Sequence, residues 1–224
     1  MKVSLIIPCY NEEQGIKKVL KSIPQGIHEI IVVDNNSTDK TSQFAREERA
    51  EVVFERRKGY GRALRTGFEK ATGDIIVTLD GDTQYPAHMI LVVVDHLMRN
   101  NLDFISCSRF PLQTRHSLTS LRILGNKLLT FLINFLFRLR LKDSQSGMWV
   151  FRKKILDHIT FESEGWTFSE EIKIKAAKYS RFSFAEFPIP YYPRLGKSNL
   201  SLIKTGLADI WFLFILRVKM LTKV

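Results

Sequence analysis

Cysteine is scarce in this chain: among its 224 residues only Cys9 and Cys107 are present, each inside an apolar run typical of a buried strand. Thiols of this kind suit a reducing compartment, so we expect no disulfide between them. The five histidines show no paired spacing, and neither cysteine has a second ligand nearby in the sequence. The sequence therefore offers no zinc site of the cysteine and histidine type.

Two common nucleotide motifs are also missing. Gly59 and Gly61 begin a glycine pattern, but the third glycine of a dinucleotide fingerprint would stand at position 64, which is Leu64. The full P-loop sequence GxxxxGK[ST] does not occur. A hydride-transfer enzyme and a P-loop NTPase are therefore disfavoured. What remains is a glycine-rich helix start, which either presents backbone N–H groups to a diphosphate or makes a tight turn.

Long apolar runs and processing signals are lacking as well. The uncharged stretches at 128–137 and 210–216 are shorter than the roughly 20 residues that a membrane-spanning helix needs. The N-terminus has no small-residue cleavage site and turns acidic at once, so it predicts a first strand rather than a signal peptide. Without repeats or a low-complexity linker, we expect one continuous domain over 1–224.

Positive charge is abundant, since 34 Lys and Arg outnumber 23 Asp and Glu and leave a net charge of +11. Such a chain attracts nucleic acid, anionic lipid or phosphorylated substrates. A nucleic-acid-binding module without catalysis would fit the charge, but no recognised nucleic-acid motif is present. The carboxylates also cluster where a polyanion binder would have none, so we expect no nucleic-acid partner.

Strand and helix patterns alternate through the first half. Four apolar, β-branched runs lie at 3–9, 29–34, 51–55 and 74–80, with helical patterns between them. Such runs are typical of a parallel sheet covered on both faces, so the sequence predicts an α/β fold. Further helices are expected at 86–100, 118–141, 169–179 and 201–223, and further strands at 102–109, 147–153 and 182–192.

Polar residues follow each of the four runs, at the edge where ligands of parallel sheets collect. In TLDGDTQYP the residues Asp80, Asp82 and Gln84 alternate, so their side chains can share one side of an extended segment. Their oxygens are hard ligands that suit Mg²⁺ or Mn²⁺. The same residue types also form polar turns, and the segment by itself fits both interpretations.

Several motifs together resemble a known family. They are PCYNEE at 8–13, VVDNNSTD at 32–39, KGYGRALRTGF at 58–68, DGDTQYP at 80–86, SR at 108–109, DSQSG at 143–147 and RLGKSN at 194–199. In this order they resemble the inverting glycosyltransferases of family 2, above all the dolichyl-phosphate mannose synthases and other polyprenyl-phosphate glycosyltransferases. The match runs from about residue 3 to 206. The chain departs from many relatives at Arg57-Lys58-Gly59 and at Met148-Trp149.

The resemblance implies a GT-A fold with a nucleotide-sugar half at 1–110, an acceptor half at 111–200 and an interfacial helix at 201–224. It implies a GDP- or UDP-hexose donor bound by Pro8, Tyr10, Asn11, Glu13, Asp34, Lys58, Gly59, Asp80 and Asp82. Asp34 would hold the base or ribose. Asp80, Asp82 and Gln84 would bind Mg²⁺ or Mn²⁺, which neutralises the charge that develops on the departing diphosphate.

The acceptor implied is a polyprenyl phosphate, whose phosphate already carries the charge needed to attack unaided. It needs cations to position it, and we expect Arg109, Arg122, Arg194, Lys197 and Ser198 to serve, although isolated arginines commonly form a solvated basic face. The expected catalytic residues are Asp82, Asp143, Arg109 and Arg194. Asp143 either orients the acceptor or acts as a base, and Glu170 and Glu171 are rival carboxylates.

Two late helical regions, 118–141 and 201–223, combine apolar residues with positive charge. The basic residues are Arg122, Lys127, Arg138, Arg140, Lys204, Arg217, Lys219 and Lys223. This composition predicts peripheral attachment to the cytoplasmic, inner face of a membrane. The alternative is that the helices pack on the core or on a second copy in a homo-oligomer.

Three activities remain open at this point. The leading hypothesis is metal-dependent transfer of a hexose, mannose or glucose, to polyprenyl phosphate. The second keeps the donor but uses a saccharide hydroxyl as acceptor, as in cell-surface glycan synthesis. The third is a nucleotidyltransferase that makes sugar nucleotides. The sequence does not select the donor base, the sugar or the lipid length.

Overall fold

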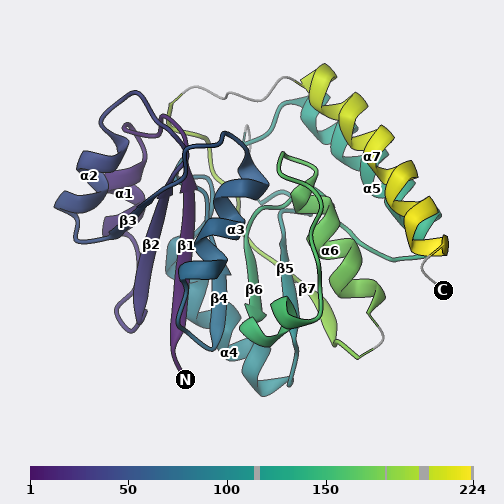
Figure 1. The fold of residues 1–224 in the computed structure, drawn as a ribbon, viewed down its shortest axis with the longest axis horizontal. Helices are drawn as coiled ribbons and strands as arrows, with labels where there is room; N and C mark the ends of the chain where they lie inside the picture. Colours follow the sequence, from purple (N-terminus) through teal and green to yellow (C-terminus); the bar gives the residue numbers. More distant parts are fainter. Residues whose placement is uncertain (114–116, 180, 197–201, 223–224) are drawn as a thin grey trace.

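A seven-stranded sheet lies at the centre of the computed structural model, which describes residues 1–113, 117–179, 181–196 and 202–222 (Figure 1). Its strands are β1 (Val3–Cys9), β2 (Glu29–Asp34), β3 (Glu51–Phe54), β4 (Ile75–Thr78), β5 (Phe104–Ser108), β6 (Trp149–Arg152) and β7 (Phe184–Pro188), in the order β3-β2-β1-β4-β6-β5-β7. The first four strands pair in parallel, which confirms the predicted parallel sheet. Strand β6 runs antiparallel between β4 and β5.

The helices are α1 (Ile16–Lys21), α2 (Thr41–Glu47), α3 (Tyr60–Lys70), α4 (Ile90–Arg99), α5 (Ser120–Phe137), α6 (Phe168–Lys178) and α7 (Leu202–Thr222), with 3-10 turns at Ala87–Met89 and Lys153–Asp157. Alternate residues of β1 point to opposite faces of the sheet, as a pleated strand requires. Leu5 and Ile7 pack with α1, α2 and α4, whereas Ile6 packs with α3 and α6. The α/β prediction is therefore confirmed, with helices on both faces.

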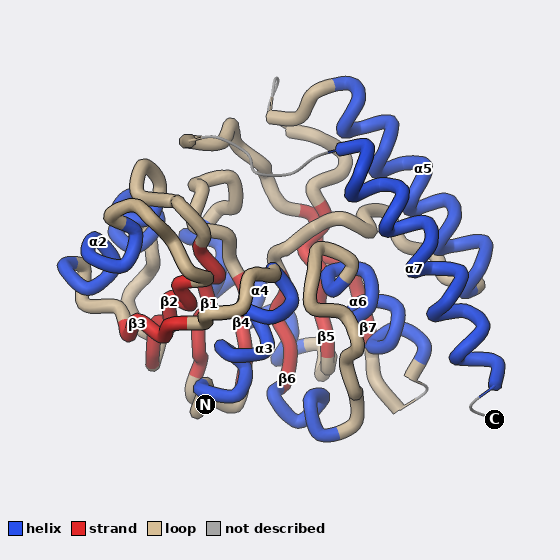
Figure 2. Tube along the Cα trace, turned by 45° about the horizontal axis from the view of Figure 1, so that its top comes forward, coloured by secondary structure: helices blue, strands red, loops and turns tan. Residues whose placement is uncertain are grey.

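Helices α5 and α7 form a separate pair beyond α6, lying side by side in both views (Figures 1 and 2). Their inner residues, such as Ile133 and Leu213, meet Ile174 of α6 in a third apolar cluster. Among the described residues, α5 has the length and composition of a helix that could cross a membrane, and 28% of it is buried. The full helix is therefore long enough to span a bilayer, whereas its uncharged stretch at 128–137 is not. Core helices of other proteins also have this length and composition.

The first helix begins later than predicted, at Ile16 instead of about residue 12. Asn11 does not cap it, because its backbone has a φ of 57° and its side-chain oxygen accepts a hydrogen bond from the Thr38 backbone N–H at 2.8 Å. The loop after β1 is therefore tied to the loop after β2, not to the helix that follows it.

Close packing of α3 on the sheet leads to a stability prediction. A Cβ at Gly67 would lie 2.4 Å from Ile6 Cγ2, whereas one at Gly125 in α5 would meet nothing within 4 Å. Overpacking of this kind costs about 1–3 kcal/mol, more than the ~1 kcal/mol that alanine gains over glycine in a helix. Gly67→Ala should lower the free energy of unfolding in urea, and Gly125→Ala should leave it equal or slightly higher. Equal effects of the two substitutions would contradict this packing.

Candidate active site

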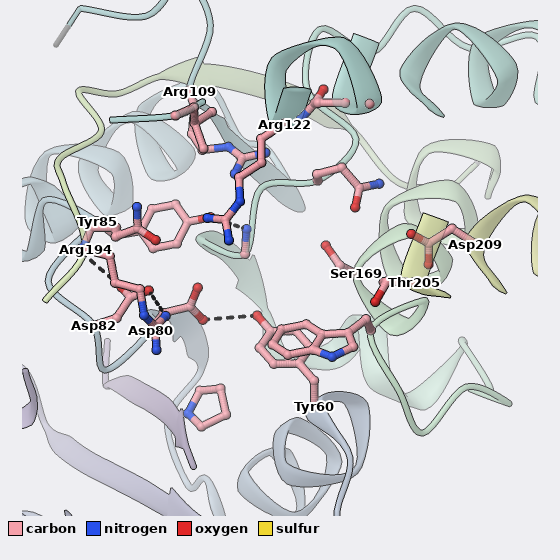
Figure 3. A pocket seen from close by; sticks show the side chains of 18 of the residues that line it. Tyr60, Asp80, Asp82, Tyr85, Arg109, Arg122, Ser169, Arg194, Thr205 and Asp209 are labelled. Atoms are coloured by element: carbon pink, nitrogen blue, oxygen red, sulfur yellow. Dashed lines mark hydrogen bonds and ion pairs between the residues drawn. The ribbon is translucent and has the colours of Figure 1, made fainter. Parts of the chain in front are cut away.

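A cavity of about 650 Å³ opens where β1 and β4 end, between the sheet and the α5–α7 pair (Figure 3). It is lined by the loops after β1 and β4, by the starts of α3 and α6, and by one side each of α5 and α7. It therefore lies at the edge where the sequence predicts a site. Many of the predicted residues lie around it: Pro8, Tyr10, Lys58, Gly59, Asp80, Asp82, Gln84, Arg109, Arg122 and Arg194.

The loop after β4 brings two carboxyl groups to the cavity. The Tyr60 hydroxyl donates to Asp80 Oδ1 at 3.3 Å, and Arg194 Nη1 donates to Asp82 Oδ2 at 2.5 Å. Arg194 also forms an ion pair with Glu12, so its guanidinium lies between two carboxylates. Burial raises the pKa of Asp80 to about 7, and the neighbouring Asp82 raises it too. Burial likewise raises the pKa of Glu12 to about 8.

This loop is both a turn and a lining of the cavity, so the two interpretations of TLDGDTQYP are compatible. Thr83 has a φ of 72°, and the Gln84 backbone N–H donates to Asp82 Oδ1 at 3.0 Å, which closes the turn. The Gln84 side chain points its amide nitrogen to the Tyr192 carbonyl at 3.1 Å. Asp82 thus shapes the loop with one oxygen and meets Arg194 with the other.

The carboxylates fit a divalent cation in charge and in ligand type. Burial is the main cause of the raised pKa values of Asp80 and Asp82, and Arg194 opposes it at both residues. A cation bound beside them would likewise favour their ionised forms. Within the described ranges no group of three His, Cys, Asp or Glu residues could hold a metal alone. A magnesium-type ion commonly takes one or two carboxylates and completes its shell with water and substrate phosphates, which matches this donor set.

Only some of the residues predicted to bind the nucleotide line the cavity, and Tyr10, Lys58 and Gly59 are among them. Lys58 Nζ donates to the Tyr10 hydroxyl at 2.7 Å and lies 4.4 Å from the centre of its ring. The Gly59 N–H donates to Asn35 Oδ1 at 2.7 Å, and the φ of 154° at Gly59 favours glycine. Asn35 is buried and lines the cavity. It belongs to the VVDNNSTD motif, but we did not predict it as a site residue.

Three predicted nucleotide ligands do not line the cavity and instead bind the loops to one another. Asn11 accepts from the Thr38 N–H, and Glu13 Oε2 accepts from the Lys40 N–H at 3.1 Å. Asp34 accepts from the Ser37 N–H at 2.9 Å and from the Ser42 hydroxyl. Each carboxylate or amide is used to close a loop, which is a common use of these side chains.

Arg109 and Asp143 form a buried, bidentate ion pair. Arg109 Nε and Nη2 donate to the two Asp143 oxygens at 2.8 Å each, and Asn126 of α5 donates to Asp143 Oδ1 at 2.7 Å. The Arg109 guanidinium holds the pKa of the Asp143 carboxyl well below its usual range, against the effect of burial. Asp143 is fully buried behind Arg109 and does not line the cavity. This geometry suits a residue that positions Arg109 and is unfavourable for a base.

The other predicted acceptor residues are differently placed. Arg122 extends from α5 into the cavity near Arg109 (Figure 3), and Arg194 pairs with Glu12 and Asp82. Lys197 and Ser198 lie outside the described residues. Of the rival carboxylates, Glu171 forms an ion pair with Lys175 at 2.5 Å and caps a loop, whereas Glu170 is buried with its pKa raised to about 8 by burial and by Asp209.

The cavity has further residues that we did not predict from the sequence. They are Tyr60, Tyr85, Trp166, Ser169, Tyr191, Thr205 and Asp209, among others. Tyr60 stands in the glycine-helix motif and Tyr85 in DGDTQYP, so both could have been found by extending those motifs. Trp166, Thr205 and Asp209 lie in no motif, and only the packing of α6 and α7 brings them to the cavity.

Known proteins share this fold. A crystal structure of glucosyl-3-phosphoglycerate synthase from Mycobacterium tuberculosis, in complex with Mn²⁺, UDP and phosphoglyceric acid, superposes with a TM-score of 0.76 at 20% identity, covering 96% of this chain and 78% of that chain. The fold of this chain is the GT-A fold of glycosyltransferases.

The family model for glycosyl transferase family 2 matches residues 4–160, and the chain belongs to this family. It is 30% identical over 209 residues to a dolichyl-phosphate hexose transferase of Haloferax volcanii, covering 92% of this chain and 90% of that protein. It is 29% identical over 220 residues to the low-salt glycan biosynthesis hexosyltransferase Agl6 of the same organism. That match covers 95% of this chain but only 53% of Agl6, so the chain spans about half of this relative.

The ion pair of Arg109 and Asp143 leads to a second prediction. Asp143→Asn leaves a buried guanidinium without its counter-charge, which should lower the free energy of unfolding by about 3–5 kcal/mol. Because the pKa of Asp143 is depressed, its contribution is complete above about pH 4 and is lost as the pH falls further. Unfolding in urea at several pH values should therefore show a smaller loss on acidification in the variant. Asp157→Asn, at an exposed position, is the control, and equal stability of the two variants would contradict the assignment.

Proposed function

We propose that this glycosyltransferase moves a hexose from a GDP- or UDP-linked donor to a polyprenyl phosphate, with inversion and with Mg²⁺ or Mn²⁺. The observation that carries the proposal is the division of one cavity into an acidic side and a basic side. Asp80 and Asp82 lie on the first, and Arg109 and Arg122 on the second. A reaction between a metal-bound diphosphate and a phosphate nucleophile needs both.

The acidic side would receive the donor. Tyr10, Lys58 and the start of α3 border it, and they would contact the nucleotide. Asp80 and Asp82 would hold the divalent ion, which supplies positive charge for the departing diphosphate when it is bound. Solved structures of this fold contain Mn²⁺ with UDP, which supports a divalent cation and a nucleotide here.

The basic side would receive the acceptor phosphate. Arg109 is fixed in place by Asp143, so its remaining N–H groups and the Arg122 guanidinium can meet phosphate oxygens without first being ordered. Such an acceptor needs no base. The saccharide-hydroxyl alternative does need one, and Asp143, with its depressed pKa, is poorly suited to that role. The relative named as a dolichyl-phosphate hexose transferase also supports the lipid acceptor.

The outer surface of the α5–α7 pair would keep the enzyme at the lipid. Large apolar side chains are exposed there: Leu124, Phe131 and Phe135 on α5, and Leu207, Trp211, Phe214, Ile215, Val218 and Leu221 on α7. Leu121 and Leu128 of α5 are exposed as well but line the cavity. Phe135 and Trp211 are 72% and 70% exposed. Exposed Lys127, Arg138 and Arg140 stand on or beside α5, and each adds about 1 kcal/mol of attraction near anionic lipid.

Four other predicted basic residues do not add an exposed, unpaired charge that the structure describes to this surface. Lys219 forms an ion pair with Glu162, and Arg217 is only partly exposed. The side chain of Lys204 and the whole of Lys223 lie outside the described residues. The proposed location is therefore the cytoplasmic face of a membrane, through apolar contact supported by the charges of α5. Association of two copies through the same surface is the alternative.

Transfer activity tests the function directly. Labelled GDP-mannose or UDP-glucose, incubated with polyprenyl phosphate and Mg²⁺ or Mn²⁺, should give label in the lipid phase. Asp82→Asn should keep the fold and lower kcat by about 10²-fold or more, because it removes a carboxylate that would hold the divalent ion at the leaving diphosphate. Asp157→Asn should remain active. Label entering a saccharide and never the lipid, or pyrophosphate released from NTP and sugar phosphate, would select one of the other activities.

Vesicle flotation tests the membrane surface. Phe135→Glu and Trp211→Glu each place a charge in the proposed contact and should reduce binding to vesicles that contain anionic lipid. Met98→Glu, at a partly exposed apolar position on α4, is the matched control and should bind as the unchanged protein does. If the two test variants float normally and instead convert a dimer to a monomer in sedimentation, the surface joins two copies and not a membrane.

A further inference from the structure

A polar cluster at the side of the cavity formed by α6 and α7 has no role in the function proposed above. Ser169 lies in the first turn of α6, and Thr205 and Asp209 lie on successive turns of α7; all three line the cavity (Figure 3). The cluster lies across the cavity from the Arg194 ion pairs (Figure 3). Its groups are hydroxyls and a carboxyl, which bind neutral polar ligands by hydrogen bonding.

Asp209 is the unexplained member of this cluster. Its side chain is 3% exposed, yet it makes no hydrogen bond or ion pair with the described residues. Glu170, on the neighbouring helix, is also buried, and its Oε2 has no partner while Oε1 accepts from Gln145 at 2.5 Å. Leaving a buried polar group unpaired costs about 1–3 kcal/mol, and in this pair of residues the cost falls on Glu170 Oε2. The Asp209 carboxyl instead faces the cavity, where a ligand can reach it (Figure 3).

Trp166 connects this cluster to the metal side. Its ring stacks on Tyr60 with centres 4.8 Å apart and planes 15° apart, and the Tyr60 hydroxyl donates to Asp80. The side chain lines the cavity and is 46% exposed, so part of its indole surface is available to a ligand. A flat apolar surface therefore extends from Asp80 toward Ser169 and Asp209.

This combination matches the chemistry of a hexose ring, which has C–H bonds on its faces and hydroxyl groups around its rim. A binding site for such a ligand needs an apolar surface and a few well-placed polar groups. We propose that Trp166, Ser169, Thr205 and Asp209 form the subsite for the hexose of the donor, with the ring on the indole and its hydroxyls bonded to the cluster. This inference rests on the proposed function, because it assumes a nucleotide-sugar donor at Asp80.

The charge state of the cluster suits hydroxyl ligands. Burial raises the pKa of Asp209 to about 7, and Asp209 in turn raises the pKa of Glu170. Gln145 and Lys173 are the other groups that act on Glu170, and both favour its ionised form. A carboxyl that is part protonated near neutral pH both accepts from and donates to hydroxyl groups. The subsite thus selects among neutral sugars through the positions of their hydroxyls.

Calorimetric titration with separate parts of the donor tests the subsite. UDP, UDP-glucose, GDP and GDP-mannose are each titrated, with Mn²⁺, into the unchanged protein and into Trp166→Ala and Asp209→Ala. For the base that binds, both variants should lose about tenfold or more in affinity for the nucleotide sugar. Asp209→Ala should keep its affinity for the nucleoside diphosphate alone within about twofold, because Asp209 is not among the proposed nucleotide contacts. Trp166→Phe, which keeps a ring beside Tyr60, should do the same and serves as the reference for Trp166→Ala.

Conservative and remote substitutions complete the test. Trp166→Phe and Asp209→Asn should recover part of the affinity, because each keeps a ring or a hydrogen-bonding group, and Asp157→Ala should match the unchanged protein. If both alanine variants bind the nucleotide sugar as tightly as the unchanged protein, the subsite is wrong and the proposed function stands. If the unchanged protein binds neither nucleotide sugar and transfers neither, the proposed function fails and this inference fails with it.

Discussion

The buried ion pair of Arg109 and Asp143 joins the parts of the molecule that form the basic side of the cavity. Asp143 accepts five hydrogen bonds, three from Arg109 and one each from Asn126 and the Gln145 backbone. The end of β5, the loop before β6 and helix α5 therefore converge on one carboxylate. A buried carboxylate is tolerated when it is paired and well hydrogen-bonded, and both oxygens of Asp143 are.

The acidic side shows the opposite electrostatic condition. Glu12 and Asp82 share the Arg194 guanidinium, Asp80 accepts a hydrogen bond from Tyr60, and burial raises the pKa of all three carboxyl groups. Arg109 thus has one carboxylate partner and Arg122 beside it, whereas three carboxyl groups lie near the single Arg194 guanidinium (Figure 3). Under the proposed function, this asymmetry would let one cavity receive an anionic acceptor and also attract a cation together with the donor.

Much of the fold could be predicted from the sequence, because apolar runs and helical patterns determine a parallel α/β sheet. The antiparallel direction of β6 could not, since a run of four residues carries no information on direction. For the site, the loops after β1, β3 and β4, where the sequence predicts site residues, line the cavity, but the orientation of Asn11, Glu13 and Asp34 depends on local turns. Asp209 and Trp166 are brought in by long-range packing, which no local pattern records. The single-domain boundaries and the individual site roles stay predictions.

Helix α5 carries two sets of side chains in alternation. Asn126 and Thr130 point inward and bond to the loop at Asp143 and Ser144, while Leu124 and Phe131 are exposed. Helix α5 therefore has two different surroundings, a polar loop on its inner side and the exterior of the protein on its outer side. Substitutions are therefore restricted at most positions of α5. We expect the sequence of this helix to change more slowly during evolution than the number of its exposed residues would predict.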